Sequence, residues 1–467
     1  MIRSRLLLII GVLTVGLFIT GFSCNSNQPD LPSVTLTIWR VWDEEDAFQD
    51  ILDAYRRQHP NVEFEYRKLR YEEYRDELLS AWARGEGPDI FSVPNYWAGE
   101  YREFMEPLPR VLELPRQETR KVLGFKTEKT IVTDKIPTYS INNLRADFAP
   151  SVVEDVVFYD DQGDQQIYAL PYSVDNLALY YNRDLLNQAA IALPANTWKE
   201  LLVQIGRLVK ENAQGELIQS GIALGSVDNI QRYVDILSML MVQDGAVMST
   251  INNKNQFRAS FDDEIKDAEG KKFHPGSHAL SFYTDFANPS KQAFSWSEEL
   301  PTAFESFTQG QLAYFLGYSY HQEMIRDAAP RLNFDVAPLP QVSLNQEANY
   351  ANYWVESVYN NSDVKNWAWD FLFYATKAEN VVSYLNATQQ PSALREVLAL
   401  QAEQDPAIEV FVNQVFTAKN WYHGQDYGTV ENAFSTMIKS ILDGESTPED
   451  ATDTAEKIIN QNEQLKE

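Results

Sequence analysis

Residues 167–186, with the sequence IYALPYSVDNLALYYNRDLL, constrain the fold of this chain more than any other stretch. Their first apolar run ends at Pro171, which favours extended geometry in the residue before it. Residues 173–176 are polar, and residues 177–181 are again apolar and strand-like. A strand interrupted in this way is poorly suited to one continuous sheet, but it can carry the chain from one domain to another. We therefore expect this stretch to lie at the floor of a cleft between two domains.

Length and composition agree with a chain of several domains. A chain of 467 residues is too long for a single hydrophobic core. Aromatic residues make up 12% of it, including 10 Trp and 24 Tyr, and these rings either fill a core or provide a ligand surface. The formal net charge of −28 disfavours a nucleic-acid partner, because such a field repels phosphate groups.

Residues 1–23 have the pattern of an export signal. Arg3 and Arg5 precede an apolar run over residues 6–22 that contains no acidic residue. Cys24, the one cysteine of the chain, follows Ser23 in a segment similar to a bacterial lipoprotein cleavage box. We expect residues 1–23 to be removed, Cys24 to be lipidated and residues 24–33 to form a tether. The alternative is an uncleaved membrane anchor, and both place the folded part outside the cytoplasmic membrane.

Residues 34–97 alternate between strand and helix patterns. Strands are predicted over 34–39, 62–66 and 88–93, and helices around 48–55 and 71–82. This order predicts a parallel sheet with right-handed crossovers. Ligands on such sheets bind beyond the carboxyl ends of the strands. The loops at these ends contain aromatic and polar residues, namely Trp42, Asp43, Asn95 and Tyr96.

Two further expectations concern local structure. Residues 107–165 contain five prolines, and we expect helices and loops there that elaborate the first domain. Four other tryptophans lie on strand or helix faces, so we expect them in the core: Trp39, Trp198, Trp367 and Trp369.

The common sequence patterns of enzymes are missing. The chain has no H-E-x-x-H, Walker A or G-x-S-x-G sequence, and no G-x-G-x-x-G follows a predicted strand. Pro275 and Gly276 separate His274 from His278 and disfavour a metal site on a helix. Because Cys24 belongs to the export signal, it is not a catalytic nucleophile. We therefore expect no enzyme activity, cofactor or metal. Acidic residues are so numerous that some pair always resembles a glycosidase pair, and no spacing in the sequence selects one.

The chain resembles the extracellular solute-binding proteins of ABC importers, in the maltose-binding-protein-like group known as family 1. Matching segments occur in the family's order over most of residues 34–460. They include VTLTIWRVWDEEDAFQDILDAYRRQHPNVEFEY, GPDIFSVPN, TWKEL, FTQGQLAYFLGYSY, FDVAPLPQ and DGESTPEDA, together with the stretch at residues 167–186 and the helix at 367–376.

This resemblance implies an α/β fold of the type II periplasmic-binding-protein class, with two discontinuous lobes joined by hinge crossings. The first lobe would comprise residues 34–173 and 317–355. The second would comprise residues 178–312 and 359–467. The crossings would lie near residues 173–177, 312–316 and 356–359.

The resemblance also implies a function. The chain would capture a solute, expected to be a carbohydrate, in the cleft and close around it by hinge motion. It would then deliver the solute to ABC permease subunits as a lipid-anchored monomer outside the cytoplasmic membrane. The expected ligand contacts are Trp42, Asp43, Asn95, Tyr96, Asp175, Asn176, Tyr318, Tyr320, Trp354 and Trp421. The open alternatives are a peptide, a polyamine or a glycerol-phosphate compound as solute, and an exported carbohydrate-active enzyme.

Overall fold

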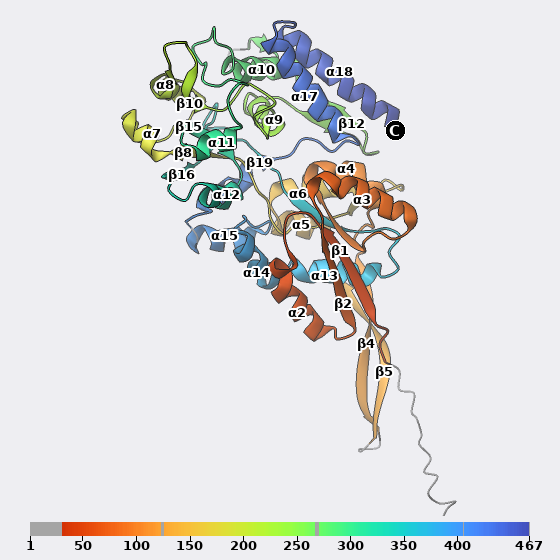
Figure 1. The fold of residues 1–467 in the computed structure, drawn as a ribbon. Helices are drawn as coiled ribbons and strands as arrows, with labels where there is room; N and C mark the ends of the chain where they lie inside the picture. Colours follow the sequence, from red (N-terminus) through yellow and green to blue (C-terminus); the bar gives the residue numbers. More distant parts are fainter. Residues whose placement is uncertain (1–29, 123–125, 267–269, 405, 467) are drawn as a thin grey trace, which may run out of the picture. The chain divides into compact units, whose positions relative to one another are not determined.

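The computed structural model describes residues 30–122, 126–266, 270–404 and 406–466 (Figure 1). The predicted export signal, Cys24 and most of the predicted tether therefore lie outside the described residues. Among the helices of the described part, none has the length and apolar character needed to cross a membrane.

A four-stranded sheet with the order β18-β3-β1-β2 organises what we call the first lobe. Its strands are β1 (Val34–Arg40), β2 (Val62–Lys68), β3 (Ile90–Pro94) and β18 (Trp354–Val358). Strand β1 runs parallel to β2 and β3, whereas β18 is antiparallel to β3. The predicted β-α-β-α-β order of residues 34–97 is confirmed.

Helices cover this sheet as the apolar spacing predicts. Phe48, at the cap of α2, and Ile51, Leu52 and Tyr55 within it follow the i, i+3, i+4, i+7 spacing of one buried helix face, and all four are at most 3% exposed. Helix α13 contacts β18 and α2, and α14 also contacts α2. The helices of this region are α2 (Gln49–Gln58), α3 (Tyr71–Arg84), α4 (Ala98–Tyr101), α5 (Ile141–Asp147), α6 (Pro150–Val156), α13 (Lys365–Ala375) and α14 (Ala378–Thr388).

A five-stranded sheet with the order β16-β8-β15-β10-β9 organises the second lobe. Strand β15 is parallel to β10 and antiparallel to β8, and β8 is also antiparallel to β16. The strands are β8 (Ala178–Asn182), β9 (Lys210–Glu211), β10 (Leu217–Ile222), β15 (Leu312–Gly317) and β16 (Phe334–Ala337).

The second lobe carries the remaining long helices. Thr197 caps α8 by accepting a hydrogen bond from the Glu200 amide, as the T-x-x-E pattern predicts. The helices are α7 (Arg183–Gln188), α8 (Trp198–Leu208), α9 (Tyr233–Gln243), α10 (Pro275–Asp285), α11 (Ala303–Thr308), α12 (His321–Ala328), α17 (Tyr427–Leu442) and α18 (Pro448–Lys466). Helices α15 (Arg395–Gln404) and α16 (Glu409–Gln414) contact each other and follow α14 in the chain.

Short strand pairs complete the fold. They are β6 (Val157–Tyr159) with β7 (Gln165–Ile167), β11 (Ser249–Ile251) with β12 (Phe257–Ala259), β13 (Ile265–Lys266) with β14 (Lys272–Phe273), and β17 (Asn349–Tyr350) with β19 (Ala418–Lys419). All four tryptophans that were expected in the core are at most 9% exposed, which confirms that prediction: Trp39, Trp198, Trp367 and Trp369.

The opening stretch passes from the first sheet to the second. Leu170 exchanges two backbone hydrogen bonds of 3.0 Å with Glu356 in β18, and Ala178 begins β8. The positions at which the chain later passes from one sheet to the other differ from the predicted boundaries of the lobes. Strands β15 and β16 both pair within the second sheet, so residues 312–337 stay in the second lobe. The chain returns to the first sheet only at β18, and α13 and α14 remain with that lobe.

The region 107–165 contains the expected helices, α5 and α6, but it also contains strands that were not expected. Two 12-residue strands, β4 (Val111–Val122) and β5 (Lys126–Pro137), pair with each other there. Residues 113–135 group with the described residues 30–33 into one compact unit, and residues 34–112 and 136–466 form another. The prolines suggested helices and loops, but Pro115 lies within β4 and Pro137 is the last residue of β5.

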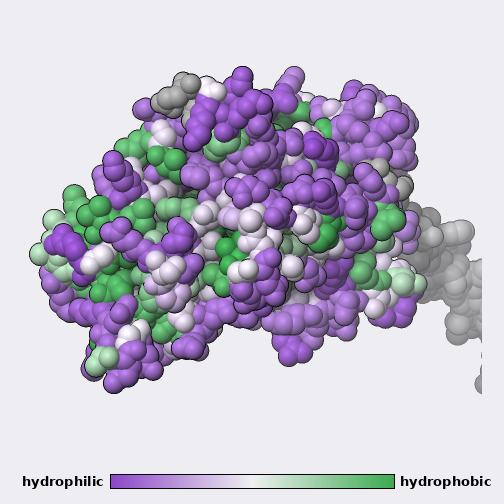
Figure 2. All heavy atoms as spheres, turned by 90° about the horizontal axis from the view of Figure 1, so that it is seen from above, coloured by the Kyte–Doolittle hydropathy of each residue, from purple (hydrophilic) through white to green (hydrophobic). Residues whose placement is uncertain are grey.

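The face drawn in Figure 2 is mostly hydrophilic, with apolar patches between hydrophilic areas. The exposed apolar side chains of the second lobe include Leu193, Leu202, Val203 and Ile218.

Candidate functional site

Three aromatic side chains of the first lobe lie against one another at the carboxyl end of its sheet. Trp42 follows β1, Tyr71 begins α3 and Trp354 begins β18, and we call these three residues the aromatic wall. The rings of Trp42 and Tyr71 are stacked, with 5.8 Å between centroids and 18° between planes. Trp354 meets both rings edge-on at 6.4 Å. Trp42 is 58% exposed, so an apolar ring face is available to a ligand.

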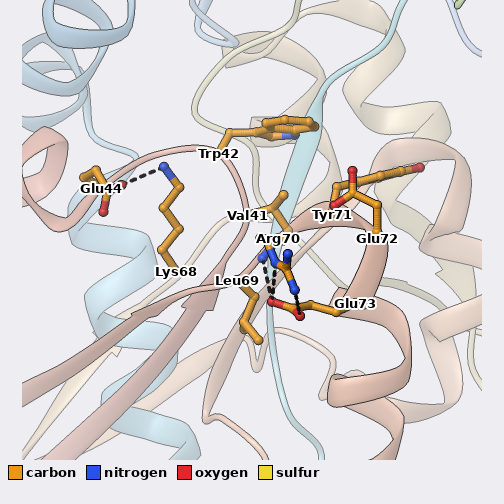
Figure 3. A pocket seen from close by; sticks show the side chains of 9 residues that line it. All are labelled: Val41, Trp42, Glu44, Lys68, Leu69, Arg70, Tyr71, Glu72 and Glu73. Carbon is orange, nitrogen blue, oxygen red and sulfur yellow. Dashed lines mark hydrogen bonds and ion pairs between the residues drawn. The ribbon is translucent and has the colours of Figure 1, made fainter.

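Trp42 and Tyr71 line a pocket of about 520 Å³ at the ends of β1 and β2. Figure 3 shows the Trp42 ring above this pocket, with charged side chains around it. The Lys68 ammonium lies 2.7 Å from Glu44, and the Arg70 guanidinium lies 2.7 Å from Glu73. The pocket therefore combines ring faces with groups that donate and accept hydrogen bonds.

A second group of side chains, on the second lobe, is polar and buried. Arg232 and Asp235 lie at the start of α9, and Tyr318 follows β15; we call these three residues the polar wall. Asp235 Oδ2 accepts hydrogen bonds from Arg232 Nε at 2.8 Å, from the Tyr318 hydroxyl and from Asn352 Nδ2 at 3.1 Å. The guanidinium carbon of Arg232 lies 5.8 Å from the centre of the Tyr318 ring.

Among the described residues, hydrogen-bond donors reach only one of the two oxygens of the Asp235 carboxylate. Its side chain is 1% exposed, and every donor described above bonds to Oδ2. The other oxygen, Oδ1, is buried and has no hydrogen-bond partner among the described residues. A buried acceptor without a donor costs about 1–3 kcal/mol. Oδ1 therefore has acceptor capacity that no described side chain uses.

Tyr71 of the aromatic wall contacts a second tyrosine, Tyr96. The hydroxyls of Tyr71 and Tyr96 are 3.4 Å apart, and the Tyr96 ring lies 4.1 Å from that of Tyr427 on α17. Burial raises the pKa of Tyr71, and the charges of Arg232 and Asp235 also act on its hydroxyl. The polar wall therefore lies within electrostatic range of Tyr71 in the aromatic wall.

The structure places three more of the expected contacts at or near this site. Tyr320 is 42% exposed and its ring is stacked on Tyr318 at 5.9 Å. Asp43 lies next to Trp42, but its carboxylate is held by Arg40 Nη2 at 2.8 Å and by the Tyr384 hydroxyl at 3.0 Å. Tyr96 is 3% exposed, and it contacts Tyr71 through its hydroxyl and Tyr427 through its ring.

Other expected contacts lie in internal hydrogen-bond networks or in the core. Asn95 is fully buried, and its Nδ2 donates to Asp155 Oδ2 at 3.1 Å. Trp421 is 5% exposed, and its Nε1 donates to Ser238 Oγ at 2.9 Å. The Trp421 ring is stacked on Phe434 in the interior of the second lobe.

The two residues expected at the cleft floor are also buried. Asp175 accepts hydrogen bonds from the Ser319 amide at 3.0 Å and from the Ser319 hydroxyl at 2.8 Å. Burial raises the pKa of Asp175 to about 7, despite these hydrogen bonds. Asn176 Nδ2 donates to the Phe411 carbonyl at 2.9 Å, and its Oδ1 accepts from Asn349 at 3.2 Å. Both side chains therefore hold the chain where it passes between the sheets.

Sequence reasoning missed Arg232, Asp235, Asn352 and Tyr71. Tyr71 is the first residue of the helix predicted around residues 71–82. The R-x-x-D spacing of Arg232 and Asp235 was a usable signal, because residues three apart at a helix start lie on one face. The structure shows no group of three or more His, Cys, Asp or Glu residues able to hold a metal ion within the residues it describes.

Comparisons with known proteins agree with this fold. The chain is similar to the cyclic α-maltosyl-1,6-maltose binding protein from Arthrobacter globiformis, with 20% identity, a TM-score of 0.70, and coverage of 92% of this chain and 98% of that one. It is also similar to the GacH receptor of Streptomyces glaucescens, with 17% identity, a TM-score of 0.66, and coverage of 93% and 99%. The sugar-binding protein MalE from Xanthomonas citri matches with 16% identity, a TM-score of 0.67, and coverage of 91% and 96%.

These similarities establish the two-lobed, maltose-binding-protein-like fold that the sequence resemblance implied. Residues 50–410, which are more than half of the chain, match the family model described as bacterial extracellular solute-binding protein. The chain therefore belongs to the family of bacterial extracellular solute-binding proteins.

Proposed function

We propose that this chain is the solute-binding component of an ABC import system and that its solute is a carbohydrate. The observation that carries this proposal is the combination of an aromatic wall, in which Trp42 is exposed, with a buried carboxylate that has an unused acceptor, Asp235 Oδ1. Aromatic faces pack against the C–H faces of sugar rings, and carboxylate and guanidinium groups bond to sugar hydroxyls. The two walls offer both kinds of contact from opposite lobes.

Capture follows from this placement. A sugar that touches both walls makes its full set of contacts only when the lobes are closed, so it shifts the population towards closure. The closed form then delivers the solute to permease subunits, and ATP hydrolysis takes place on another subunit. We propose that the protein acts as a monomer anchored outside the cytoplasmic membrane through a lipid on Cys24.

The choice of sugar is guided by the similar structures. The GacH receptor has a structure in complex with acarbose, and the Arthrobacter protein is a cyclic α-maltosyl-1,6-maltose binding protein. We therefore propose an α-linked gluco-oligosaccharide, linear or cyclic, as the first class to test. The paired charges of Arg232 and Asp235 favour a neutral solute over a polyamine or a phosphate.

The test is isothermal titration calorimetry with maltose, maltotriose, maltotetraose and cyclic gluco-oligosaccharides. Spermidine, a tetrapeptide and glycerol 3-phosphate serve as the competing classes. We expect saturable binding of at least one oligosaccharide and none of the competing solutes. Binding of spermidine, peptide or glycerol phosphate alone would overturn the choice of a carbohydrate. A parallel hydrolysis assay on the bound sugar should give no product, and turnover would instead indicate an enzyme.

A further inference from the structure

Two strips of chain, one from each lobe, lie against each other. The first-lobe strip comprises residues 95–99, which follow β3, together with Asp155 on α6. The second-lobe strip comprises residues 420–427, which lead from β19 into α17. Three direct contacts of different kinds join the two strips: a carboxylate with an imidazole, a pair of rings, and a glycine against the backbone.

Each strip is held by its own lobe. In the first lobe, α6 contacts the residues that follow β3. In the second lobe, Trp421 Nε1 donates to Ser238 Oγ of α9 at 2.9 Å. The Tyr422 hydroxyl donates to Glu463 of α18 at 2.5 Å. A change in the angle between the lobes would therefore move one strip away from the other.

The first contact is made by a buried carboxylate. Asp155 is fully buried, and His423 Nε2 lies 2.8 Å from its Oδ1. Asn420 Nδ2 donates to the same oxygen at 3.0 Å. The donors to Oδ2, Asn95 and Tyr353, both belong to the first lobe. One oxygen of this carboxylate is therefore satisfied from each lobe, and a buried carboxylate that loses its partners is costly.

The second contact is made by two tyrosine rings. The ring centroids of Tyr96 and Tyr427 lie 4.1 Å apart, and each residue is 3% exposed. The Tyr96 hydroxyl also lies 3.4 Å from that of Tyr71 in the aromatic wall. The contact between the strips is therefore directly beside the candidate site.

The third contact requires a glycine. A Cβ atom on Gly99 would overlap the carbonyl oxygen of His423 and would lie 2.7 Å from that of Gly424. Gly99 lies in α4 and does not have a positive φ, so alanine would suit the helix itself better than glycine. The absence of a side chain at this position is therefore required by the second lobe and not by the backbone of the first.

We propose that these three contacts form an interlobe latch, which stabilises the closed arrangement of the lobes independently of the solute. A solute that binds between the lobes has an apparent affinity proportional to the population of the form that can bind it. The latch would therefore adjust the affinity without touching the solute. This consequence for affinity rests on the proposed function, whereas the latch itself does not.

The first experiment measures the distance between the lobes by pulsed electron paramagnetic resonance. The full chain in detergent carries Cys24→Ser and spin labels at two exposed helix positions, Ser80→Cys on α3 and Thr454→Cys on α18. Without sugar, this protein should show a short-distance population. Gly99→Ala should reduce that population several-fold, because the added methyl group presses on the second-lobe strip. His423→Ala should also reduce it, because one partner of the buried carboxylate is lost.

The matched control is Gly206→Ala in α8, where a Cβ atom would have no neighbour within 4 Å among the described residues and φ is not positive. It should leave the distance distribution unchanged. Thermal melting followed by circular dichroism identifies the variants that fold. The inference is overturned if a folded Gly99→Ala or His423→Ala variant has an unchanged distribution, or if the sugar-free protein has no short-distance population.

The second experiment is calorimetry with the oligosaccharide that binds most tightly. Gly99→Ala should weaken binding by about tenfold, because the closed form is less populated, and Gly206→Ala should not. Equal affinity of the two variants would contradict the effect of the latch on binding. If no oligosaccharide binds to any of these proteins, the carbohydrate proposal fails, and the distances measured without sugar still decide whether the latch exists.

Discussion

The two walls of the candidate site are built in opposite ways. The aromatic wall is held by ring stacking and exposes 58% of Trp42, while the polar wall buries Asp235 to 1% exposure within a hydrogen-bond network. Stacked rings provide contact area with little directional preference. A carboxylate fixed by three donors offers one acceptor in a defined direction. We therefore expect the aromatic wall to contribute affinity and the polar wall to contribute selectivity as well as stability.

The largest effect is expected from Asp235→Ala. The change removes the acceptor for a ligand hydroxyl and leaves Arg232, Tyr318 and Asn352 without a shared partner. We predict at least a 100-fold loss of sugar affinity by calorimetry, roughly 3 kcal/mol, and a loss of about 3–5 kcal/mol in unfolding free energy by urea denaturation.

A control and a ligand series separate the two roles of Asp235. Asp228→Ala removes an exposed carboxylate that pairs with Lys439. It should change neither the sugar affinity nor the unfolding free energy appreciably. Deoxy sugars that lack single hydroxyls should bind Asp235→Asn with little discrimination, whereas the wild type should reject one of them about tenfold. Equal rejection by both proteins would show that Asp235 has only a structural role.

The next effect concerns Asp175, which supports Ser319 beside the polar wall. Its pKa is raised to about 7 in the folded chain from an ordinary value of 3.8, so the folded state binds the additional proton between these pH values. Stability should therefore fall as pH rises from about 4 to 7, by roughly 2–4 kcal/mol relative to Asp175→Asn. Urea denaturation of both proteins across this range measures the difference. If the unfolding free energies of the wild type and the variant changed with pH in parallel, the raised pKa of Asp175 would be contradicted.

A smaller effect is expected at Trp42. Trp42→Ala removes the exposed stacking face, and we predict a loss of sugar affinity of about 10-fold, or ~1.4 kcal/mol, by calorimetry. The unfolding free energy should change by less than about 0.5 kcal/mol, because the ring is largely exposed. Trp42→Phe should restore part of the affinity. A loss of stability without a loss of affinity would remove Trp42 from the site.

The smallest effect on binding is expected at Trp421, which was predicted to contact the ligand and is buried. Trp421→Phe leaves the Ser238 hydroxyl without its donor, so it should lower the unfolding free energy by about 1 kcal/mol. Sugar affinity should change by less than twofold. A tenfold loss of affinity in calorimetry would place Trp421 in the ligand contact after all.

Much of the fold could be predicted from periodicity, because burial of one helix face depends on local spacing. The buried face of α2 and the core tryptophans are examples. The sheet to which β15 and β16 belong could not be predicted in this way, since a buried strand has the same pattern in either sheet. The hairpin was missed because prolines at strand positions were read as helix and loop signals.

The candidate site was only partly predictable for a related reason. Residue type and loop position suggested Trp42 and Asn95 equally, yet only Trp42 exposes its side chain. The Asn95 side chain bonds to Asp155, which is 60 positions away in the sequence. Asp235 accepts hydrogen bonds from Tyr318 and Asn352, which the fold brings to it from other elements. Such long-range partners leave no periodic signal.

The central claim is that one sugar contacts both walls and draws the lobes together. Hydrogen–deuterium exchange with and without a saturating concentration of the oligosaccharide that binds most tightly tests this claim most directly. We predict slower exchange of backbone amides at the start of α3, residues 71–74, and at the start of α9, residues 233–236, in the same experiment. Protection confined to one of these helices, or no change in either, would contradict binding between the lobes.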